Sequence, residues 1–285
     1  MHNNPVKRVI ICEAGATKAD WRVIEDGMEV FRLQTEGTNV STMSFESICS
    51  IIREAAEKMP CKTCSRIHFY TAGVVTPQIS TRLEELLKEC FKASETEIQT
   101  DLTATARAAC GHEPGIAVIM GTGSNSCLWD GVKVVSRVLS GGFILGDEGS
   151  AASLGRVFIS DYIKGLVPEE IASAYAESFP SGYSEIISLV YGRESSPSGW
   201  LGSLCPFILS HYAHPYIKNI VDSNFMNFAD RCLSQYDTST YPVSIIGGFG
   251  NSLKDIIRPI FEQRGIRIRA FIPSPIENLI DYHIK

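Results

Sequence analysis

The sequence predicts an α/β protein of two lobes, in which each lobe is a mixed sheet covered by helices. Three observations lead to this prediction. A pattern of strand, small-residue turn and strand occurs twice, strand-like and helix-like segments alternate after the first copy, and 285 residues are enough for two cores of moderate size. Helices that alternate with strands after a meander of hairpins are typical of a mixed sheet.

The first lobe is expected to open with three strands, at residues 7–13, 20–25 and 29–35. A short apolar run rich in β-branched residues indicates the first strand, and Asp26-Gly27 is a favoured hairpin turn between the other two. Apolar residues that recur at helical spacing from Phe45 to Ala55 predict a helix. We then expect a strand at 67–71, a helix at 80–91, a strand at 97–100 and a small-residue helix at 102–110.

The second lobe is expected to repeat the meander over residues 116–139, with Asp130-Gly131 as a hairpin turn. Residues 151 to about 236 are mostly helical in pattern and are interrupted by several prolines. A strand is expected at 243–246, ending in the turn Gly247-Gly248-Phe249-Gly250. A helix at 253–263 and a last short helix at 275–285 complete the prediction.

The predicted lobes are not separated by a low-complexity linker, so we expect continuous structure to join them at the helix of 102–110. The first lobe is predicted to span residues 1–108, with 274–285 crossing back to it. The second lobe is predicted to span residues 109–273 and to contain a helical insertion.

The composition favours a cytoplasmic protein that acts on a small molecule. Lys and Arg number 26 against 32 Asp and Glu, a net charge of −6, and the positive charges are scattered, unlike those of a surface that binds nucleic acid or an anionic membrane. No apolar stretch approaches the roughly 20 residues of a membrane span, and residues 1–7 lack the apolar core of a secretory signal. We therefore expect neither a nucleic-acid partner nor a membrane partner.

The nine cysteines and six histidines do not form a recognisable metal-binding pattern. Several cysteines lie inside apolar runs, where they behave as small core residues, so a reducing compartment fits better than a disulfide framework. Cys61 and Cys64 have redox or half-zinc spacing, but no second pair stands nearby to complete a zinc site, and we expect an exposed loop with two thiols. His211 and His214 lie three residues apart on an expected helix and lack a third ligand.

Two turns of small residues follow strands, one at 12–18 and one at 121–126. The glycines in these turns let backbone N–H groups approach an anion without obstruction by Cβ. Neither turn has the spacing of a Walker or Rossmann loop, and an ordinary tight hairpin is the alternative for each turn taken alone. Because the turn is built twice, we expect the two lobes to clamp one nucleotide between them.

Three residues with functional potential are predicted at the carboxyl ends of strands, where ligands gather in sheets of this kind. They are Glu13, Gly73 and Asp101. Asp101 also begins a predicted helix, so a helix N-cap is the alternative to a catalytic role.

Three strings of residues link the chain to a known family. They are Glu-Ala-Gly-Ala-Thr-Lys at 13–18, Gly-Thr-Gly-Ser-Asn at 121–125 and Gly-Asp-Glu-Gly-Ser at 146–150. Over nearly its whole length the chain resembles the N-acetylglucosamine kinase group of the BadF/BadG/BcrA/BcrD ATPase-type family. The resemblance implies a two-lobed actin-like ATPase fold made of duplicated ribonuclease H-like domains, with ATP and Mg²⁺ as cofactors, a sugar as substrate and a possible homodimer.

The resemblance implies that the phosphates of ATP are bound at both turns. Glu13 is expected to hold Mg²⁺, because hard cations prefer carboxylate and phosphate oxygens, with a carboxylate that caps the turn as the alternative. Lys18 is expected to balance phosphate charge, unless the next strand turns it to solvent. The expected nucleotide contacts are Gly15, Thr17, Lys18, Thr122, Gly123 and Gly248.

The acceptor alcohol must lose its proton as it attacks phosphorus, so a carboxylate within hydrogen-bond reach is expected. The family places this base in a Thr-Asp segment, which Thr100-Asp101 matches. The expected sugar contacts are Asn39, Asp101, Gly142 and Asp147. Asn39 as a turn residue and Asp147 as a helix cap are the alternatives.

The expected activity is ATP-dependent phosphorylation of a sugar hydroxyl, the 6-OH of N-acetylglucosamine or a related amino sugar. One alternative is an ATPase activator of a 2-hydroxyacyl-CoA dehydratase, whose relatives hold an iron–sulfur cluster through cysteines, with Cys110 and Cys127 as candidates. Another is a non-catalytic sugar sensor. The chain departs from the family pattern at Phe143, in a shortened loop where Trp is usual, and at Ala14 and Ala16, where glycines are common. The identity of the sugar therefore stays open.

Overall fold

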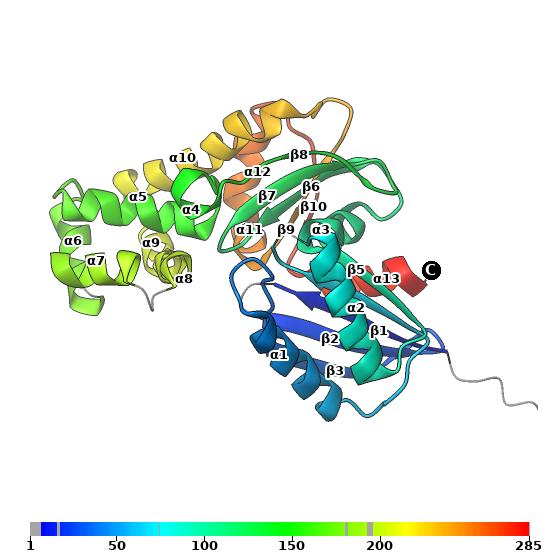
Figure 1. The fold of residues 1–285 in the computed structure, drawn as a ribbon. Coiled ribbons are helices and arrows are strands. Elements are labelled where there is room, and N and C mark those ends of the chain that lie inside the picture. The colour runs from blue at the N-terminus through cyan, green and yellow to red at the C-terminus, as the bar shows by residue number, and fades with distance from the viewer. Residues whose placement is uncertain (1–6, 16–17, 74, 180–181, 193–195, 285) are drawn as a thin grey trace, which may run out of the picture. The chain divides into compact units, whose positions relative to one another are not determined.

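The computed structural model describes residues 7–15, 18–73, 75–179, 182–192 and 196–284. Its contacts divide the chain into two compact units, Met1–His112 with Pro275–Lys285, and Glu113–Ser274. Each unit contains one five-stranded sheet with helices packed on it (Figure 1). The predicted α/β class is confirmed.

The sheet of the first unit begins with an antiparallel meander and continues with parallel strands. Its order is β3-β2-β1-β4-β5, in which β1 pairs antiparallel with β2 and parallel with β4. The strands are β1 (Arg8–Ala14), β2 (Lys18–Glu25), β3 (Met28–Glu36), β4 (Arg66–Thr71) and β5 (Glu95–Thr100). Since β1, β4 and β5 run in parallel, their carboxyl ends meet at one edge of the sheet.

The helices of the first unit are α1 (Phe45–Lys58), α2 (Pro77–Phe91), α3 (Asp101–Cys110) and α13 (Ile276–Ile284). Hydroxyl side chains start the first two, because Ser44 Oγ accepts a hydrogen bond from the Ser47 amide and Thr76 Oγ1 accepts one from the Ile79 amide. Pro77 at the first position of α2 sacrifices no helical hydrogen bond.

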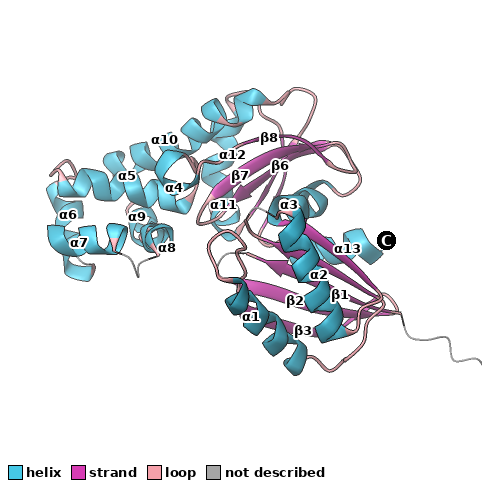
Figure 2. Cartoon of the chain, in the orientation of Figure 1, coloured by secondary structure: helices cyan, strands magenta, loops and turns pink. Residues whose placement is uncertain are grey.

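The two faces of this sheet differ in what they bury. Helices α1 and α2 lie on the side that faces the viewer in Figure 2 and pack on an apolar layer that includes Trp21 and Phe69. Helices α3 and α13 pack against each other and against β1. Because side chains alternate along a strand, Glu13, Asp20 and His68 belong to this second, more polar face.

The sheet of the second unit repeats the topology of the first. Its order is β8-β7-β6-β9-β10, with β6, β7 and β8 antiparallel and with β9 and β10 parallel to β6. The strands are β6 (Gly115–Met120), β7 (Ser124–Trp129), β8 (Val134–Val138), β9 (Val243–Ile246) and β10 (Ile268–Ile272). Two sheets of one order and one set of directions are the duplicated ribonuclease H-like architecture that was predicted.

Most of the helices of the second unit lie between β8 and β9. These are α4 (Gly142–Leu145), α5 (Ala151–Ile163), α6 (Glu169–Ser178), α7 (Tyr183–Tyr191), α8 (Pro197–Ser203), α9 (Cys205–Ser210), α10 (Pro215–Arg231) and the 3₁₀ turn η1 (Leu233–Gln235); α11 (Gly248–Ser252) and α12 (Lys254–Glu262) follow β9. Aromatic rings hold the helical segment together, since Phe158 and Phe207 both pack edge-on against Tyr175 at centroid distances of 5.4 and 5.8 Å.

The structure corrects three sequence-based expectations. Strand β10 was not predicted, because it lies at a sheet edge and its Arg269 interrupts the apolar pattern. Cys61 and Cys64 were expected in an exposed loop, but both side chains are buried against the core under α1 and α2. His211 and His214 do not share a helix: His211 ends α9 and His214 caps α10.

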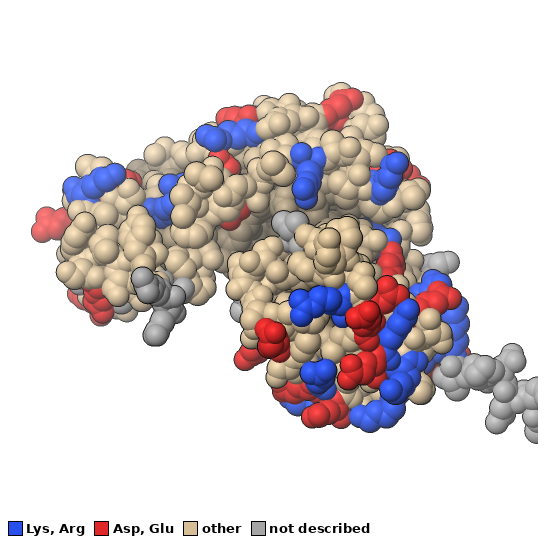
Figure 3. Space-filling view, in the orientation of Figure 1, with Lys and Arg blue, Asp and Glu red and all other residues tan. Residues whose placement is uncertain are grey.

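The distribution of charged side chains on the surface agrees with the scattered charges of the sequence. On the face of the first unit seen in Figure 3, acidic and basic side chains are intermingled. Among the described residues, no helix is both long and apolar enough to cross a membrane.

Candidate active site

Two carboxylates of the first unit lie at the edge where the parallel strands end. Glu13 is the penultimate residue of β1, and Asp101 directly follows β5 and opens α3. Burial, followed by the charges of Asp20 and Asp101, raises the pKa of Glu13 to about 7. Burial raises the pKa of Asp101 to about 6, against the hydrogen bond that its carboxylate accepts from the Leu102 amide at 2.8 Å.

The structure separates Asp101 from the helix N-cap. Thr100 is the capping residue of α3, because its Oγ1 accepts a hydrogen bond from the Thr103 amide at 3.2 Å. Asp101 stands one position later, where a carboxylate adds favourable charge at the helix N-terminus. The alternative interpretation, in which Asp101 is the N-cap of α3, is therefore wrong. The Asp101 carboxylate remains available for another role.

The first turn is only partly described, because Thr17 lies outside the described residues. Its closure is seen in the hydrogen bond from the Gly15 amide to the Lys18 carbonyl at 3.0 Å. The Lys18 side chain is 60% exposed and its Nζ lies 3.1 Å from Asp20 Oδ2. Lys18 is therefore neither buried in the turn nor directed freely to solvent.

Asn39 lies at the same sheet edge, because it forms an isolated bridge with Ala72, just beyond β4. Its Oδ1 accepts a hydrogen bond from the Ser41 amide at 2.9 Å. A Cβ on Gly73 would lie 2.6 Å from this oxygen, and Gly73 also has a φ of +93°. Gly73 is therefore needed for the Asn39 side chain to fold over the end of the strand.

In the second unit, the turn after β6 is hydrogen-bonded to the start of helix α5. The Gly121 amide donates to the Gly123 carbonyl at 3.0 Å, and the amides of Ala151 and Ala152 donate to the carbonyls of Gly121 and Thr122, each at 3.0 Å. The turn after β6 is thus fixed to the first residues of α5. Helix α5 itself is capped by Ser150, whose Oγ accepts from the Ser153 amide.

A cavity of about 420 Å³ opens beside this turn. Its walls come from three places in the sequence: Gly121 and Thr122 in the turn, Gly202, Cys205 and Leu209 in the helical segment, and Gly248 and Phe249 after β9. The structure therefore brings the predicted residues Thr122 and Gly248 together. The helical residues of this wall were missed, because nothing in their local pattern distinguishes them from core residues.

Glycine at 247 makes the close approach behind this cavity possible. A Cβ on Gly247 would lie 2.2 Å from the Met120 carbonyl oxygen, and Gly247 has a φ of +129°. The turn that carries Gly248 can thus lie directly against the end of β6.

Asp147 lies against the turn of the second unit. Its backbone is in the left-handed region, with a φ of +55°, and its amide donates to the Ser140 carbonyl at 3.0 Å. Burial raises the pKa of Asp147 to about 6, although a hydrogen bond from the Ser124 backbone opposes this shift. Gly142 opens the short helix α4 with a φ of +69° and is exposed. Asp147 does not cap a helix, since Ser150 caps α5.

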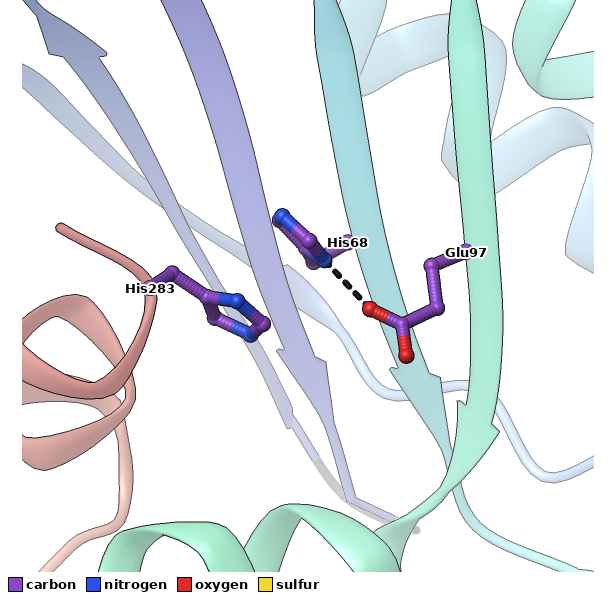
Figure 4. Close-up of side chains that lie close together, drawn as sticks. All are labelled: His68, Glu97 and His283. Atoms are coloured by element: carbon purple, nitrogen blue, oxygen red, sulfur yellow. Dashed lines mark hydrogen bonds and ion pairs between the residues drawn. The ribbon is translucent and has the colours of Figure 1, made fainter. Parts of the chain in front are cut away.

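A third group of residues, His68, Glu97 and His283, was not anticipated (Figure 4). Their potential ligand atoms all lie within 4.8 Å of one another, although they come from β4, β5 and α13. His68 Nδ1 lies 2.6 Å from Glu97 Oε2, Arg107 donates to Glu97 Oε1 at 2.7 Å, and the Tyr70 hydroxyl lies 2.6 Å from His283 Nε2.

This cluster is better suited to holding α13 than to holding a metal. The His68 and His283 rings are stacked at 3.6 Å with an interplanar angle of 23°, and His68 Nδ1 and His283 Nε2 already lie within hydrogen-bond distance of Glu97 and Tyr70. The Arg107 guanidinium beside Glu97 also opposes a second cation. The network instead ties the C-terminal helix to the sheet of the first unit.

Comparison with solved structures identifies similar proteins. A protein from Porphyromonas gingivalis, described as a candidate N-acetylglucosamine kinase, is 33% identical with a TM-score of 0.88, and the match covers 97% of this chain and 98% of that one. A second such protein, from Chromobacterium violaceum, is 20% identical with a TM-score of 0.78, covering 98% and 99%. A ROK family glucokinase from Streptomyces griseus, solved with glucose and AMPPNP, shares the fold at 17% identity and a TM-score of 0.52, covering 98% of each chain. No family model and no curated protein matches the sequence.

Proposed function

Because this chain belongs to the N-acetylglucosamine kinase group of the BadF/BadG/BcrA/BcrD ATPase-type family, we propose that it transfers the γ-phosphoryl group of ATP to a sugar hydroxyl. The acceptor is the 6-OH of N-acetylglucosamine or of a related amino sugar. The observation that carries this proposal is the partly buried Asp101 carboxylate, which lies at the edge of the first sheet where the parallel strands end, while Thr100 caps the helix.

Asp101 is proposed as the general base. As the sugar oxygen forms its bond to the γ-phosphorus, the bond from that phosphorus to the bridging oxygen of ADP breaks, and the hydroxyl proton passes to Asp101. A base works best when its pKa lies near the working pH. Burial places the pKa of Asp101 at about 6, which suits this task better than the usual value of an exposed aspartate.

Glu13 and its surroundings fit a magnesium ion. Burial and the neighbouring carboxylates of Asp20 and Asp101 oppose ionisation of Glu13, and a divalent cation would relieve that repulsion. Oxygen ligands of this type are the ones that Mg²⁺ prefers. Glu13 would hold Mg²⁺ on the phosphates, where the ion supplies balance for their charge.

The nucleotide contacts are proposed in both units. In the second unit, Thr122, Gly123 and Gly248 are proposed to contact the nucleotide, and the cavity lined by Thr122 and Gly248 has the size of a small-molecule site. In the first unit, Gly15 and Lys18 are proposed to contact the phosphates, together with Thr17.

The sugar contacts are proposed for Asn39, Asp147 and Gly142, in addition to Asp101. A buried carboxylate or amide that bonds a sugar hydroxyl rejects an analogue that lacks it, because the polar group is then left unpaired. Asp147 is buried at the turn of the second unit.

We propose the cytoplasm as the compartment, since ATP is supplied there, and a homodimer stays a prediction from the resemblance.

The thiols give the dehydratase-activator alternative little support. Cys110 and Cys127 are both buried, the first at 6% exposure and the second at 0%. A cluster that is held between two subunits needs thiols that reach the surface.

A coupled assay of ADP release tests the proposal. Wild-type protein with Mg-ATP is offered N-acetylglucosamine, N-acetylmannosamine, N-acetylmuramic acid and glucose, beside Asp101→Asn and the control Asp130→Asn, which changes an exposed carboxylate in the β7–β8 turn. We expect release that depends on one of the sugars, a loss of about 10²- to 10⁴-fold in kcat for Asp101→Asn, and near-normal rates for the control. ADP release at the same rate with and without each sugar would support an ATPase activator. An absence of ADP release would support a sensor.

A further inference from the structure

Helix α10 carries a polar side chain on the face that packs into the core of the second unit. Asn224 lies in the middle of this helix and is 4% exposed, and its buried neighbours along the helix, such as Val221 and Phe228, are apolar. Asparagine is a poor helix former, because its side chain competes for backbone hydrogen bonds. Burial of an amide is also costly unless its polar atoms are paired. Specific contacts of the Asn224 amide must offset both costs.

Both polar atoms of the Asn224 side chain bond to the loop of residues 146–150, which contains Asp147. The Oδ1 atom accepts a hydrogen bond from the Gly149 amide at 3.1 Å, and Nδ2 donates to the Ser150 carbonyl at 3.1 Å. Phe228, one helical turn further along α10, covers the same loop, since a Cβ on Gly149 would lie 2.9 Å from Phe228 Cβ. One face of α10 therefore holds the 146–150 loop through both packing and hydrogen bonds.

Other contacts hold the 146–150 loop from further directions. Ser124 Oγ, at the start of β7, donates to the Glu148 carbonyl at 2.7 Å, and the Glu148 carboxylate forms an ion pair with Arg231 of α10 at 2.6 Å. The Ser150 amide donates to the Asp147 carbonyl at 3.1 Å. These bonds maintain the left-handed backbone of Asp147, with its φ of +55°, which an aspartate adopts only where its surroundings fix it.

The 146–150 loop is also continuous with the turn after β6. Ser150 caps α5, and the next two amides of the chain donate to the carbonyls of Gly121 and Thr122, each at 3.0 Å. Asn224 bonds the Ser150 carbonyl, which directly precedes these amides. A displacement of the loop should therefore move both the Asp147 carboxylate and the turn.

From these contacts we infer that Asn224 is a positioning residue for both substrates, because it fixes the Asp147 carboxylate for the sugar and the turn after β6 for the phosphates of ATP. The inference rests on the proposed function and deepens it. Among the described residues that line the cavity beside this turn, Asn224 is absent. Asn224 thus acts through the 146–150 loop and touches neither substrate.

Asn224→Leu tests the inference, because leucine has the same branched skeleton, adds no charge and makes neither hydrogen bond. The Gly149 amide and the Ser150 carbonyl then lose their partner. In the ADP-release assay with the sugar that the wild type phosphorylates, we expect the KM for the sugar and the KM for ATP each to rise about tenfold, with kcat within about threefold of the wild type. Ser124→Ala, a smaller change to the core, should raise both KM values about threefold.

Ile217→Val is the control for a purely structural role. Ile217 is a fully buried residue of α10 that packs in the core, so its truncation should lower Tm and leave both KM values as in the wild type. If Asn224→Leu and Ser124→Ala also lower Tm and leave both KM values unchanged, the inference is overturned.

A double-mutant cycle tests whether Asn224 acts through Asp147. Asp147→Asn weakens the proposed sugar contact by itself, so the further change Asn224→Leu should raise the sugar KM by no more than about twofold in that background. Two losses that multiply would show independent effects and would overturn the inference. If no sugar stimulates ADP release by the wild type, the kinase proposal itself fails and takes the inference with it. An active wild type with unaltered variants sinks the inference alone, so the two failures are distinguishable.

Discussion

The carboxylate of Asp147 occupies the space that a side chain at position 123 would need. A Cβ on Gly123 would lie 3.0 Å from Asp147 Oδ2, closer than such contacts normally allow. The proposed phosphate turn and the proposed sugar carboxylate of the second unit are therefore in direct contact. A change in one is expected to move the other.

Gly123→Ala should displace the Asp147 carboxylate by a few tenths of an ångström. We expect the KM for the sugar to rise about fivefold, equivalent to about 1 kcal/mol, because the geometry of a buried polar contact is disturbed. Steady-state kinetics with the sugar as variable substrate measures this. Gly182→Ala is the control, since a Cβ there meets open space, and an unaltered sugar KM in Gly123→Ala would contradict the expected coupling.

The rate should fall in acid because Asp101 must be ionised to accept a proton. Its pKa is raised to about 6 by burial, so kcat/KM should be near its plateau above pH 7 and should decline as the pH falls through 6. A pH–rate profile measures this. Because burial also raises the pKa of Asp147 to about 6, the profile of Asp147→Asn is needed beside it. We expect this variant to keep the acid limb, and loss of the limb there would assign it to Asp147.

Glu97→Gln should destabilise the first unit. Glu97 accepts a charged hydrogen bond from Arg107 and pairs with His68, and removal of its charge leaves the half-buried Arg107 without its counter-ion. We expect the free energy of unfolding to fall by about 2 kcal/mol, as measured by urea denaturation. Glu89→Gln removes an exposed partner of Arg53 at 3.6 Å and should cost no more than about 0.5 kcal/mol. Equal losses of unfolding free energy in the two variants would show that the network of Glu97, Arg107 and His68 stabilises the protein no more than an exposed ion pair does.

The stability of the protein should depend on His283 in mild acid. Burial, and then the charges of His68 and Arg107, lower the pKa of His283 to about 3, with Glu97 partly opposing. An unfolded histidine has a pKa near 6.5, so the folded state holds His283 neutral where the unfolded chain binds a proton. This contribution is complete above pH 6.5 and is lost as the pH falls from 6.5 toward 3.

The loss should show as a lower free energy of unfolding at pH 5 than at pH 7.5. His283→Gln removes the titrating group, so its stability should change less over this interval than that of the wild type. Parallel curves for the two proteins would place the acid sensitivity on other groups.

Local sequence patterns were sufficient to place most strands and helices. In each meander an Asp-Gly turn joins the second strand to the third, and the helices α1, α2 and α3 carry apolar residues at helical spacing, so periodicity and turn chemistry identify them. The strings at 121–125 and 146–150 likewise indicated the turn after β6 and the position of Asp147. These features depend only on residues that are close in sequence.

Tertiary structure decided what depends on residues far apart in the sequence. The hydrogen bond of Thr100 assigned the N-cap of α3 to Thr100 and not to Asp101, and the cavity beside Thr122 needed α8, α9 and the turn after β9 to meet. The cluster of His68, Glu97 and His283 spans more than two hundred residues of chain. Periodicity shows which face of an element is apolar, but only packing determines which polar side chains from distant elements share one buried space.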